Sequence, residues 1–220
     1  MKKLFLPLLI STFLLSLYSC SSMRKLSVTN ADAAGALKEM LEVGVRESVN
    51  TTFDQHNILA TLFPEPVAKT LNTIQQLGVS RDLDRFTETL SIAAQKSTER
   101  AVPVFLNAID KMSFTDALQI VKNGGTAGTD YLRSTAGTEL RAALRPVMAN
   151  ALEEYHVNEA WNKLVNGSLN NRFNLDLPNL MAGMVSEKMF QKIAETEQNI
   201  RGNASARSTE LMQRVFSMRY

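Results

Sequence analysis

The segment from Asn123 to Thr129 holds three glycines and two threonines directly before a predicted helix. Glycine-rich turns and helix N-termini expose backbone N–H groups, which bind anions such as phosphate or carboxylate. Together with the next helical turn, this segment makes Thr126, Thr129, Asp130 and Arg133 the candidates for an anion or polar site. The lysine of a Walker motif is missing. The same composition is also typical of a C-cap followed by an N-cap between two helices.

Methionine is concentrated near the C-terminus, at Met181, Met184, Met189, Met212 and Met218. Methionine packs adaptably and recurs at promiscuous binding surfaces, although at helical spacing it is more often part of a core. The first three residues are therefore the candidates for contact with an apolar ligand.

Patterns for nucleophilic or metal chemistry are weak. His56 and His156 are isolated, whereas zinc motifs such as His-Glu-x-x-His place a second ligand four residues away. Ser22 and Lys25 fit Ser-x-x-Lys, but they lie in a predicted flexible tether, and no Gly-x-Ser-x-Gly elbow occurs. We therefore expect no catalytic residue, no metal ion and no cofactor.

Carboxylates are abundant, and most of them fit solvated helix faces. Glu197 and Arg201 are spaced i,i+4, which on an exposed helix stabilises by about 0.2–0.5 kcal/mol. Sequence spacing does not exclude a pair of acids brought together by the fold, as in glycosidases. A hydrolase of envelope material with an unrecognised carboxylate site therefore stays open as an alternative.

The N-terminus has the layout of a bacterial export signal. Two lysines precede the apolar run from Leu4 to Leu17, which is shorter than the roughly 20 residues of a membrane-spanning helix. The run ends in Leu17-Tyr18-Ser19-Cys20, which looks like a lipobox, and Cys20 is the only cysteine. We predict a signal peptide over residues 1–19, lipidation of Cys20 with palmitate-type acyl chains, a flexible tether over residues 20–30, and one domain over residues 31–220. The alternative is a cleaved secretory signal beside a stray cysteine.

The net charge of the chain and the residues that follow Cys20 indicate the protein's compartment and its kind of partner. Residues 1–19 hold two lysines and no acid, so the remaining chain has 22 basic and 22 acidic residues. A neutral surface lacks the basic footprint of a nucleic-acid-binding protein. Ser21 and Ser22 carry no inner-membrane retention signal. We expect a soluble domain on the periplasmic face of the outer membrane, held there by the lipid anchor.

Helical periodicity runs through the rest of the chain, with almost no strand-type alternation. Apolar stripes mark successive helices at Leu37–Val49, Val67–Leu77, Leu83–Ala94, Leu106–Ile109, Ala117–Val121, Thr129–Arg133, Leu140–Leu152, Trp161–Val165, Met181–Ile200 and Leu211–Phe216. These segments predict an all-α fold, an irregular bundle of about nine helices in a single domain.

Several helix boundaries have specific signals. Pro103 and Pro146 predict kinks or fresh starts, because a proline inside a helix costs about 3 kcal/mol. Ser113 with Asp116 resembles a capping box. Asp176 followed by Pro178 predicts the start of the long C-terminal helix.

These landmarks together resemble the bacterial lipoprotein family catalogued as domain of unknown function 4197. The resemblance covers nearly all of the chain after the signal, and it rests on Leu62-Phe63-Pro64, Ala93-Ala94, Ala108 to Ser113 with Asp116-Ala117, Gly124, Thr129 to Arg133, Thr135, Leu140, Pro146, Ile193, Glu197, Ile200-Arg201, Asn203, Arg207, Leu211 and Val215-Phe216. The chain departs from the family pattern at Gly128 and Ala204, where alanine and proline are usual. The resemblance implies a helical fold behind a lipobox or signal peptide, and it brings no established activity.

We therefore expect a non-enzymatic envelope lipoprotein whose periplasmic domain binds a partner or serves as a scaffold. The first alternative is a carrier or binder of a lipid or other apolar small molecule. An envelope protein or an apolar ligand is the expected partner besides the membrane, and nucleic acid is not.

Overall fold

The computed structural model describes residues 27–51, 53, 55, 57–76, 81–167 and 175–218. Within these residues there are nine α-helices, two short 3-10 helices and no strand. The helices are α2 (Asn30–Glu47), α3 (Ile58–Leu62), α4 (Glu65–Gln76), α5 (Arg81–Lys111), α6 (Ala117–Asn123), α7 (Ala127–Glu154), α8 (Val157–Gly167), α9 (Leu177–Gly202) and α10 (Glu210–Phe216), with 3-10 turns η2 (Ser48–Asn50) and η3 (Ala204–Ala206). The predicted all-helical fold is confirmed.

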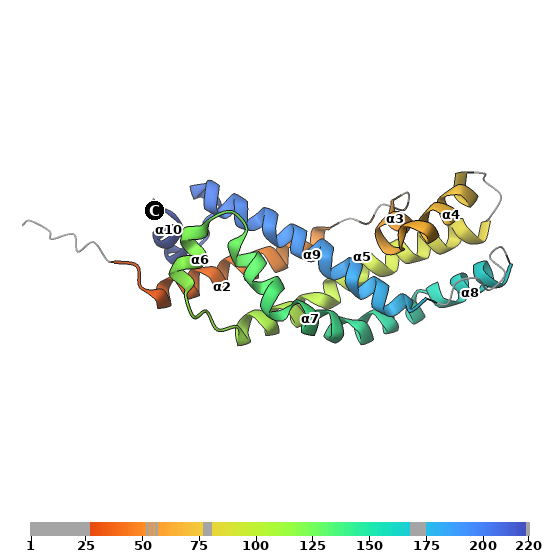
Figure 1. The fold of residues 1–220 in the computed structure, drawn as a ribbon, viewed down its shortest axis with the longest axis horizontal. Helices are drawn as coiled ribbons and strands as arrows, with labels where there is room; N and C mark the ends of the chain where they lie inside the picture. Colours follow the sequence, from red (N-terminus) through yellow and green to blue (C-terminus); the bar gives the residue numbers. More distant parts are fainter. Residues whose placement is uncertain are drawn as a thin grey trace, which may run out of the picture.

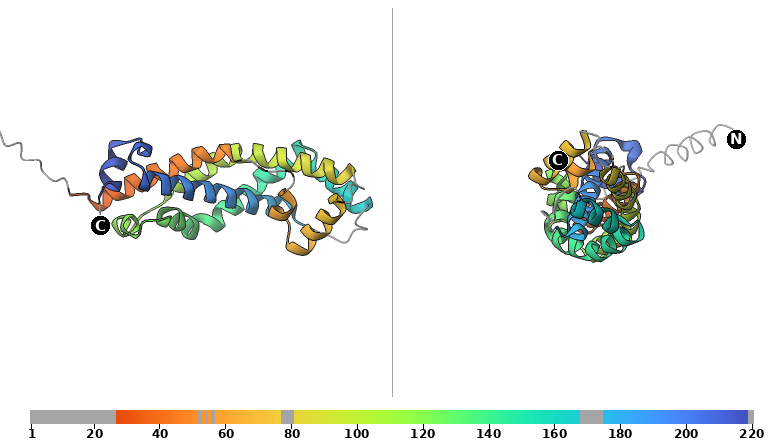
Figure 2. Two further views of the ribbon diagram at one scale, coloured as in Figure 1. Left: turned by 90° about the horizontal axis from the view of Figure 1, so that it is seen from above. Right: turned by 90° about the vertical axis from the view of Figure 1, so that its right-hand side faces the viewer.

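The molecule is an elongated bundle built on four long helices, α2, α5, α7 and α9 (Figures 1 and 2). Helix α9 packs along both α7 and α2, and α5 packs along α7. The short helices α6 and α10 lie at the end where the described chain begins, while α3, α4 and α8 lie at the opposite end (Figure 1). We call these the tether end and the far end of the bundle. No helix in the described part of the chain is long and apolar enough to cross a membrane.

Polar caps begin several helices where the sequence offers them. Thr29 and Asp32 form a reciprocal capping box at the start of α2. Asp176 accepts from the backbone N–H of Asn179 at the start of α9, which confirms that predicted boundary. The predicted capping role of Ser113 is wrong. Asp116 itself caps α6 by accepting from the N–H of Gln119. Gly124 ends α6 at a φ of 67°, a conformation that favours glycine.

The two internal prolines do not break their helices. Helix α5 runs through Pro103, and α7 runs through Pro146, so that the two predicted segments Thr129–Arg133 and Leu140–Leu152 form one helix. Buried side chains on both sides of each proline pack against neighbouring helices: Ala101 and Phe105 in α5, Leu144 and Met148 in α7. This packing offsets the hydrogen bond that each proline removes. A short window of sequence does not reveal such packing, because it comes from distant helices.

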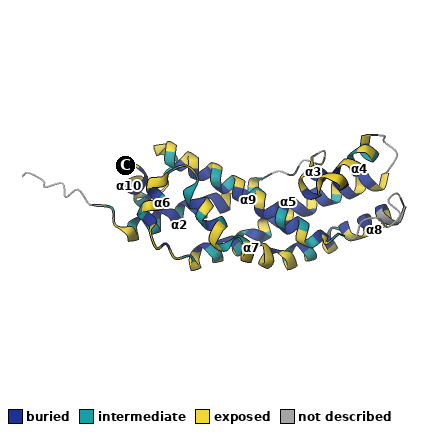
Figure 3. Cartoon of the chain, viewed as in Figure 1, coloured by how far each residue is buried: buried dark blue, intermediate teal, exposed yellow. Residues whose placement is uncertain are grey.

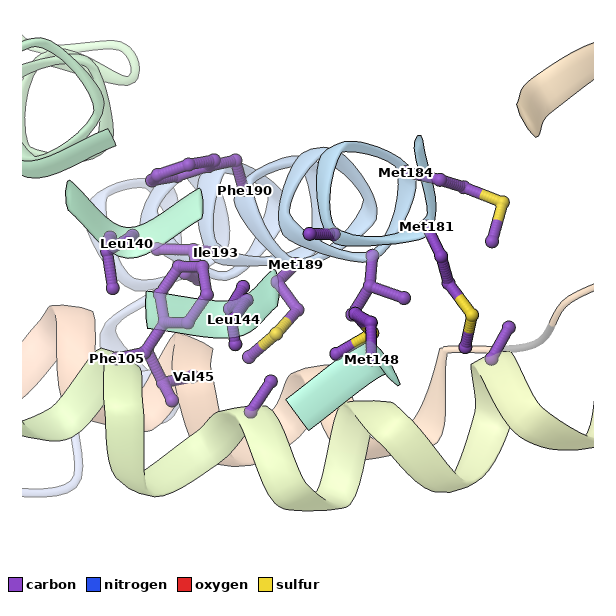
Figure 4. Packing of buried hydrophobic residues seen from close by; sticks show 14 of the residues in the cluster. Val45, Phe105, Leu140, Leu144, Met148, Met181, Met184, Met189, Phe190 and Ile193 are labelled. Atoms are coloured by element: carbon purple, nitrogen blue, oxygen red, sulfur yellow. The ribbon is translucent and has the colours of Figure 1, made fainter. Parts of the chain in front are cut away.

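The apolar faces of the long helices point inward along the whole bundle (Figure 3). In the middle, Phe105 of α5 meets Phe190 of α9 edge-on, with ring centroids 5.3 Å apart (Figure 4). At the far end Phe63, Phe86 and Trp161 form a second aromatic cluster, which joins α3, α5 and α8. All of the described core residues lie between residues 33 and 216, so residues 26–220 contain the whole described core.

Candidate functional site

The glycine-rich turn does expose backbone donors at the start of α7, and a carboxylate of the same chain binds them. The backbone N–H groups of Gly128 and Thr129 donate to the two carboxylate oxygens of Glu197 at 2.9 and 2.7 Å. The Thr129 hydroxyl donates to the same carboxylate at 2.7 Å. The helix N-terminus thus holds an internal anion contributed by α9.

Glu197 is fully buried, so the expectation of an exposed i,i+4 pair is wrong. Arg201 donates to it from Nε and Nη2 at 2.9 and 2.8 Å. The same guanidinium donates to the carbonyl oxygens of Ile120 and Val121 at the end of α6, and it lies over the Phe216 ring. The Glu197–Arg201 pair therefore connects α6, α7, α9 and α10, and tertiary packing buries it.

The other candidates for the anion site do not converge on Thr129. The Thr126 hydroxyl donates to the carboxylate of Asp130, which is exposed to solvent. Arg133 pairs with Glu187 of α9 and lies 4.5 Å above the Phe190 ring centroid. Of the four residues, only Thr129 takes part in the buried network, and the donors there are already occupied.

The three methionine candidates divide between the core and the surface. Met181 and Met189 are fully buried and point into the core between α9, α7 and α5 (Figure 4). Met184 is 5% exposed and lines a groove on the outside of the bundle.

This groove lies between α3, α7 and α9 and has a volume of about 570 Å³. We call it the α3/α7/α9 groove. Its lining combines three apolar side chains with five polar or charged ones and one glycine: Leu62, Leu180 and Met184; Thr61, Arg141, Glu187, Lys188 and Gln191; and Gly183. The lining is therefore mixed, with polar groups outnumbering apolar ones, and the volume falls within the usual range of small-molecule sites.

Arg141 of α7 reaches over α9 to the edge of this groove. Its Nη2 donates to the carbonyl oxygen of Asn179 at 3.3 Å, the one hydrogen bond it makes among the described residues. The guanidinium lies directly on Gly183, where an added Cβ would come within 2.9 Å of its Cζ and Nη2. Glycine at position 183 thus holds room for this cation against the backbone of α9.

The charges that line the groove are unbalanced. Lys188 is half-buried and makes no hydrogen bond or ion pair within the part of the chain that the structure describes. Glu187, the one carboxylate in the lining, is paired with Arg133 from outside the groove. Two cations therefore face the groove without a carboxylate partner among the described residues.

The other hollows differ from this groove in the charges that line them. A hollow of about 710 Å³ at η3 and α10 is lined by Arg207 and Arg214, but both are engaged, Arg207 with backbone carbonyls and Arg214 with Asp32. A shallow groove between α5 and α7 carries one cation and one acid, Lys111 and Glu139. The α3/α7/α9 groove differs from them in that two cations without a carboxylate partner among the described residues face it, whereas the more apolar α5/α7 groove has Lys111 beside the acid Glu139.

The isolated histidines and the lipidation site take no part in the groove. His156 is exposed at the start of α8, with its Nδ1 3.8 Å from Glu159. His56 and Cys20 lie outside the described residues. Among the residues that are described, no three His, Cys, Asp or Glu side chains group as metal ligands.

A family model for proteins of unknown function, DUF4197, matches residues 27–217. The chain belongs to this family. The DUF4197 match runs from before α2 to just after α10, and so it includes every residue that lines the groove. No curated protein and no solved structure matches the chain.

Sequence reasoning found Met184 but missed Arg141, Leu62 and Lys188. On α9, the groove residues Leu180, Met184, Glu187 and Gln191 repeat at three- and four-residue spacing, which is a stripe visible in the sequence. The partners from α3 and α7 lie more than 35 residues away along the chain, and no local pattern connects them with this stripe.

Proposed function

We propose that this DUF4197 protein is a lipoprotein of the cell envelope, anchored through Cys20 to the periplasmic face of the outer membrane. The lipobox-like end of the signal, Leu17-Tyr18-Ser19-Cys20, and the absence of an acidic retention signal after it support this localisation. Two or three acyl chains would make the attachment effectively permanent, because each buried CH₂ contributes about 0.8 kcal/mol.

Replacing the cysteine tests the anchor. Cys20→Ala should abolish incorporation of labelled palmitate and release the protein from membranes, because no other side chain forms the thioether. Ser21→Ala, the neighbouring polar residue, is the matched control and should be labelled as the wild type is. A Cys20→Ala protein that still takes up label would disprove the lipoprotein assignment.

The function of the folded domain is binding rather than catalysis, and the α3/α7/α9 groove is the observation that carries this proposal. The groove lies about 27 Å along α9 from the tether end, at 1.5 Å per residue from Gly202 to Met184. An anchored bundle would thus hold a ligand away from the bilayer surface. A protein-scaffold role and a lipid-carrier role both agree with such a position, and the lining favours a partly apolar small molecule.

The groove is poorly equipped for hydrolysis. General acid–base mechanisms of the glycosidase type need two carboxylates, one on each side of the bond that is cleaved. Glu187 is the one acid that lines the groove, and it is tied to Arg133. This arrangement supports a non-enzymatic site.

Filling the groove tests the binding function. Thr61 is exposed on α3 at the edge of the groove, so Thr61→Trp should occupy the space without burying a charge. We expect native mass spectrometry of residues 26–220, prepared without detergent, to show a bound apolar molecule that is lost from this variant. Met184→Asp should also lose it, although a charge at a buried site threatens the fold.

The control for this experiment is Thr70→Trp. Thr70 is also an exposed helical threonine whose hydroxyl donates to a carbonyl four residues back, but it lies on α4 away from the groove. Equal occupancy in the two tryptophan variants, or an empty wild type that fails to take up an added apolar ligand, would contradict the binding function. A carboxylate-dependent hydrolytic activity would favour the enzyme alternative instead.

A further inference from the structure

The charges of the groove identify the class of ligand. We infer that the α3/α7/α9 groove binds a single-chain amphiphile with an anionic head, its chain on Leu62, Leu180 and Met184 and its head between Arg141 and Lys188. This inference rests on the proposed binding function and adds the chemistry of the ligand to it.

The apolar part of the site comes from two helices that pack on each other. Leu62 of α3 and Met184 of α9 are 5% exposed each, and Leu180 is half-buried beside them. Leu180 therefore supplies most of the accessible apolar surface, and Leu62 and Met184 add only a small exposed edge. So small an apolar surface suits a single hydrocarbon chain better than a ligand with several chains.

The polar part comes from cations whose bonding capacity is unused. A guanidinium has five N–H donors, and Arg141 uses one of them, on the carbonyl of Asn179. Lys188 has three donors, and within the described chain it uses none. A carboxylate or phosphate head would supply the charge-assisted acceptors that both side chains lack.

The position of Arg141 depends on the glycine beneath it. With a Cβ at position 183, the guanidinium would have to move away from α9, which costs little because it is the end of a flexible and exposed side chain. Alanine also favours a helix interior over glycine. Gly183→Ala should therefore stabilise the fold and weaken binding of the anionic head, and a merely structural role of Gly183 does not predict these opposite effects.

The experiment compares ligands that share a chain but differ in the head. Laurate and dodecyl phosphate carry the charge, 1-dodecanol has the chain without it, and acetate has the charge without the chain. Binding to residues 26–220 is measured by native mass spectrometry and calorimetry below the micelle concentration. We expect laurate and dodecyl phosphate to bind more tightly than dodecanol, and acetate not to bind. The tighter of the two charged ligands then distinguishes a fatty-acid source from a phospholipid-type source.

Charge removal then locates the head. Arg141→Gln with Lys188→Gln should weaken laurate binding about fivefold or more and change dodecanol binding less than about twofold, given the usual strength of exposed charge pairs. Lys111→Gln in the α5/α7 groove removes the same charge elsewhere and should change neither. Gly183→Ala should weaken laurate binding in the same direction while raising the melting temperature by about 2–4 °C.

The outcomes separate the inference from the proposed function. Equal binding of laurate and dodecanol, both blocked by Thr61→Trp, would overturn the anionic head and leave the groove as an apolar binding site. Laurate binding that is unchanged by the Arg141 and Lys188 substitutions, or equally weakened by Lys111→Gln, would also overturn it. If no chain-bearing ligand binds, or if Thr61→Trp blocks none of them, the binding function of the groove fails as well.

Discussion

Glu197 is the residue on which most of the tether end depends. Its buried carboxylate accepts from two backbone N–H groups, a hydroxyl and a guanidinium, and the same guanidinium continues to α6 and α10. A buried charge needs this degree of hydrogen bonding to be tolerated at all. The network explains why a glycine-rich turn that looks like an anion site is satisfied from within the chain.

Removing the Glu197 carboxylate should be among the most damaging single changes. Glu197→Ala leaves Arg201 and the donors of Gly128 and Thr129 buried without their acceptor, and we expect a loss of about 3–5 kcal/mol in the free energy of unfolding, measured with urea. Glu195→Gln is the matched control, because Glu195 is an exposed acid of the same helix paired only with Lys192. The control should lose at most about 1 kcal/mol. Equal losses in the two variants would show that the buried network contributes little.

At the scale of elements, the crossing of α2 and α9 depends on close backbone approach. An added Cβ at Gly44 of α2 would lie 2.9 Å from the Cα of Ile193 in α9. Gly44→Ala should therefore force the helices apart and cost about 1–3 kcal/mol, as overpacked cores do. Gly137→Ala in α7, where the nearest atom is 3.8 Å away, should instead be neutral or stabilising by up to about 1 kcal/mol. Thermal unfolding of the pair checks this, and a Gly44→Ala protein as stable as Gly137→Ala would contradict the tight crossing.

An ion pair between Asp32 and Arg214 joins the start of α2 to α10, and the titration of Asp32 is measurable. Hydrogen bonds from the backbone N–H and hydroxyl of Thr29, together with the Arg214 guanidinium, hold the pKa of Asp32 below its usual value of 3.8. Because folding lowers this pKa, the Asp32 charge stabilises the fold at pH values above the pKa of the unfolded state. This contribution is lost as pH falls through the pKa of the folded state.

Asp32→Asn should therefore be less stable than the wild type near pH 7, and the difference should shrink as pH falls below about 3.8. Urea unfolding across the acid range measures it. Asp110→Asn is the control, since Asp110 is exposed on α5 and its side chain has no partner among the described residues. A gap between Asp32→Asn and wild type that stays constant with pH would argue against a role for the Asp32 charge.

At the scale of the whole molecule, α10 closes the tether end of the bundle (Figure 1). It packs on α2 and buries Met212, Val215 and Phe216, while Arg214 pairs with Asp32 at 2.6 Å. The last apolar stripe of the sequence is thus an integral part of the core, although Met212 is fully buried with Val215 and Leu211 is only half-buried.

Truncation after Gly202 should unfold the domain or weaken it severely. Each of the three buried side chains contributes about 1.5–3 kcal/mol, which together approaches a typical total stability of about 5–15 kcal/mol. Circular dichroism melting of the truncated domain measures the loss, and a domain that ends at Met218 is the control. An unchanged melting temperature after truncation at Gly202 would identify the C-terminal segment as an appendage.

The sequence by itself determined the helical class of the fold and several of its helix boundaries, although no predicted stripe covers α3. Apolar stripes at helical spacing and caps such as Asp176 act over a few residues, so local reading of the chain finds them. The same local character explains the failures at Pro103 and Pro146. Long neighbouring helices stabilise α5 and α7 there by packing, which outweighs the local cost of proline.

Only the tertiary structure decided which polar residues are buried and which surface is hollowed. The sequence predicts a solvated Glu197–Arg201 pair, whereas in the structure α6, α7 and α10 pack around the pair and bury it. Met184 becomes a groove residue, and Met181 a core residue, because of how α9 is rotated against α3 and α7. Burial and pocket shape arise from contacts between segments far apart in the chain, and neither composition nor spacing encodes which of those segments meet.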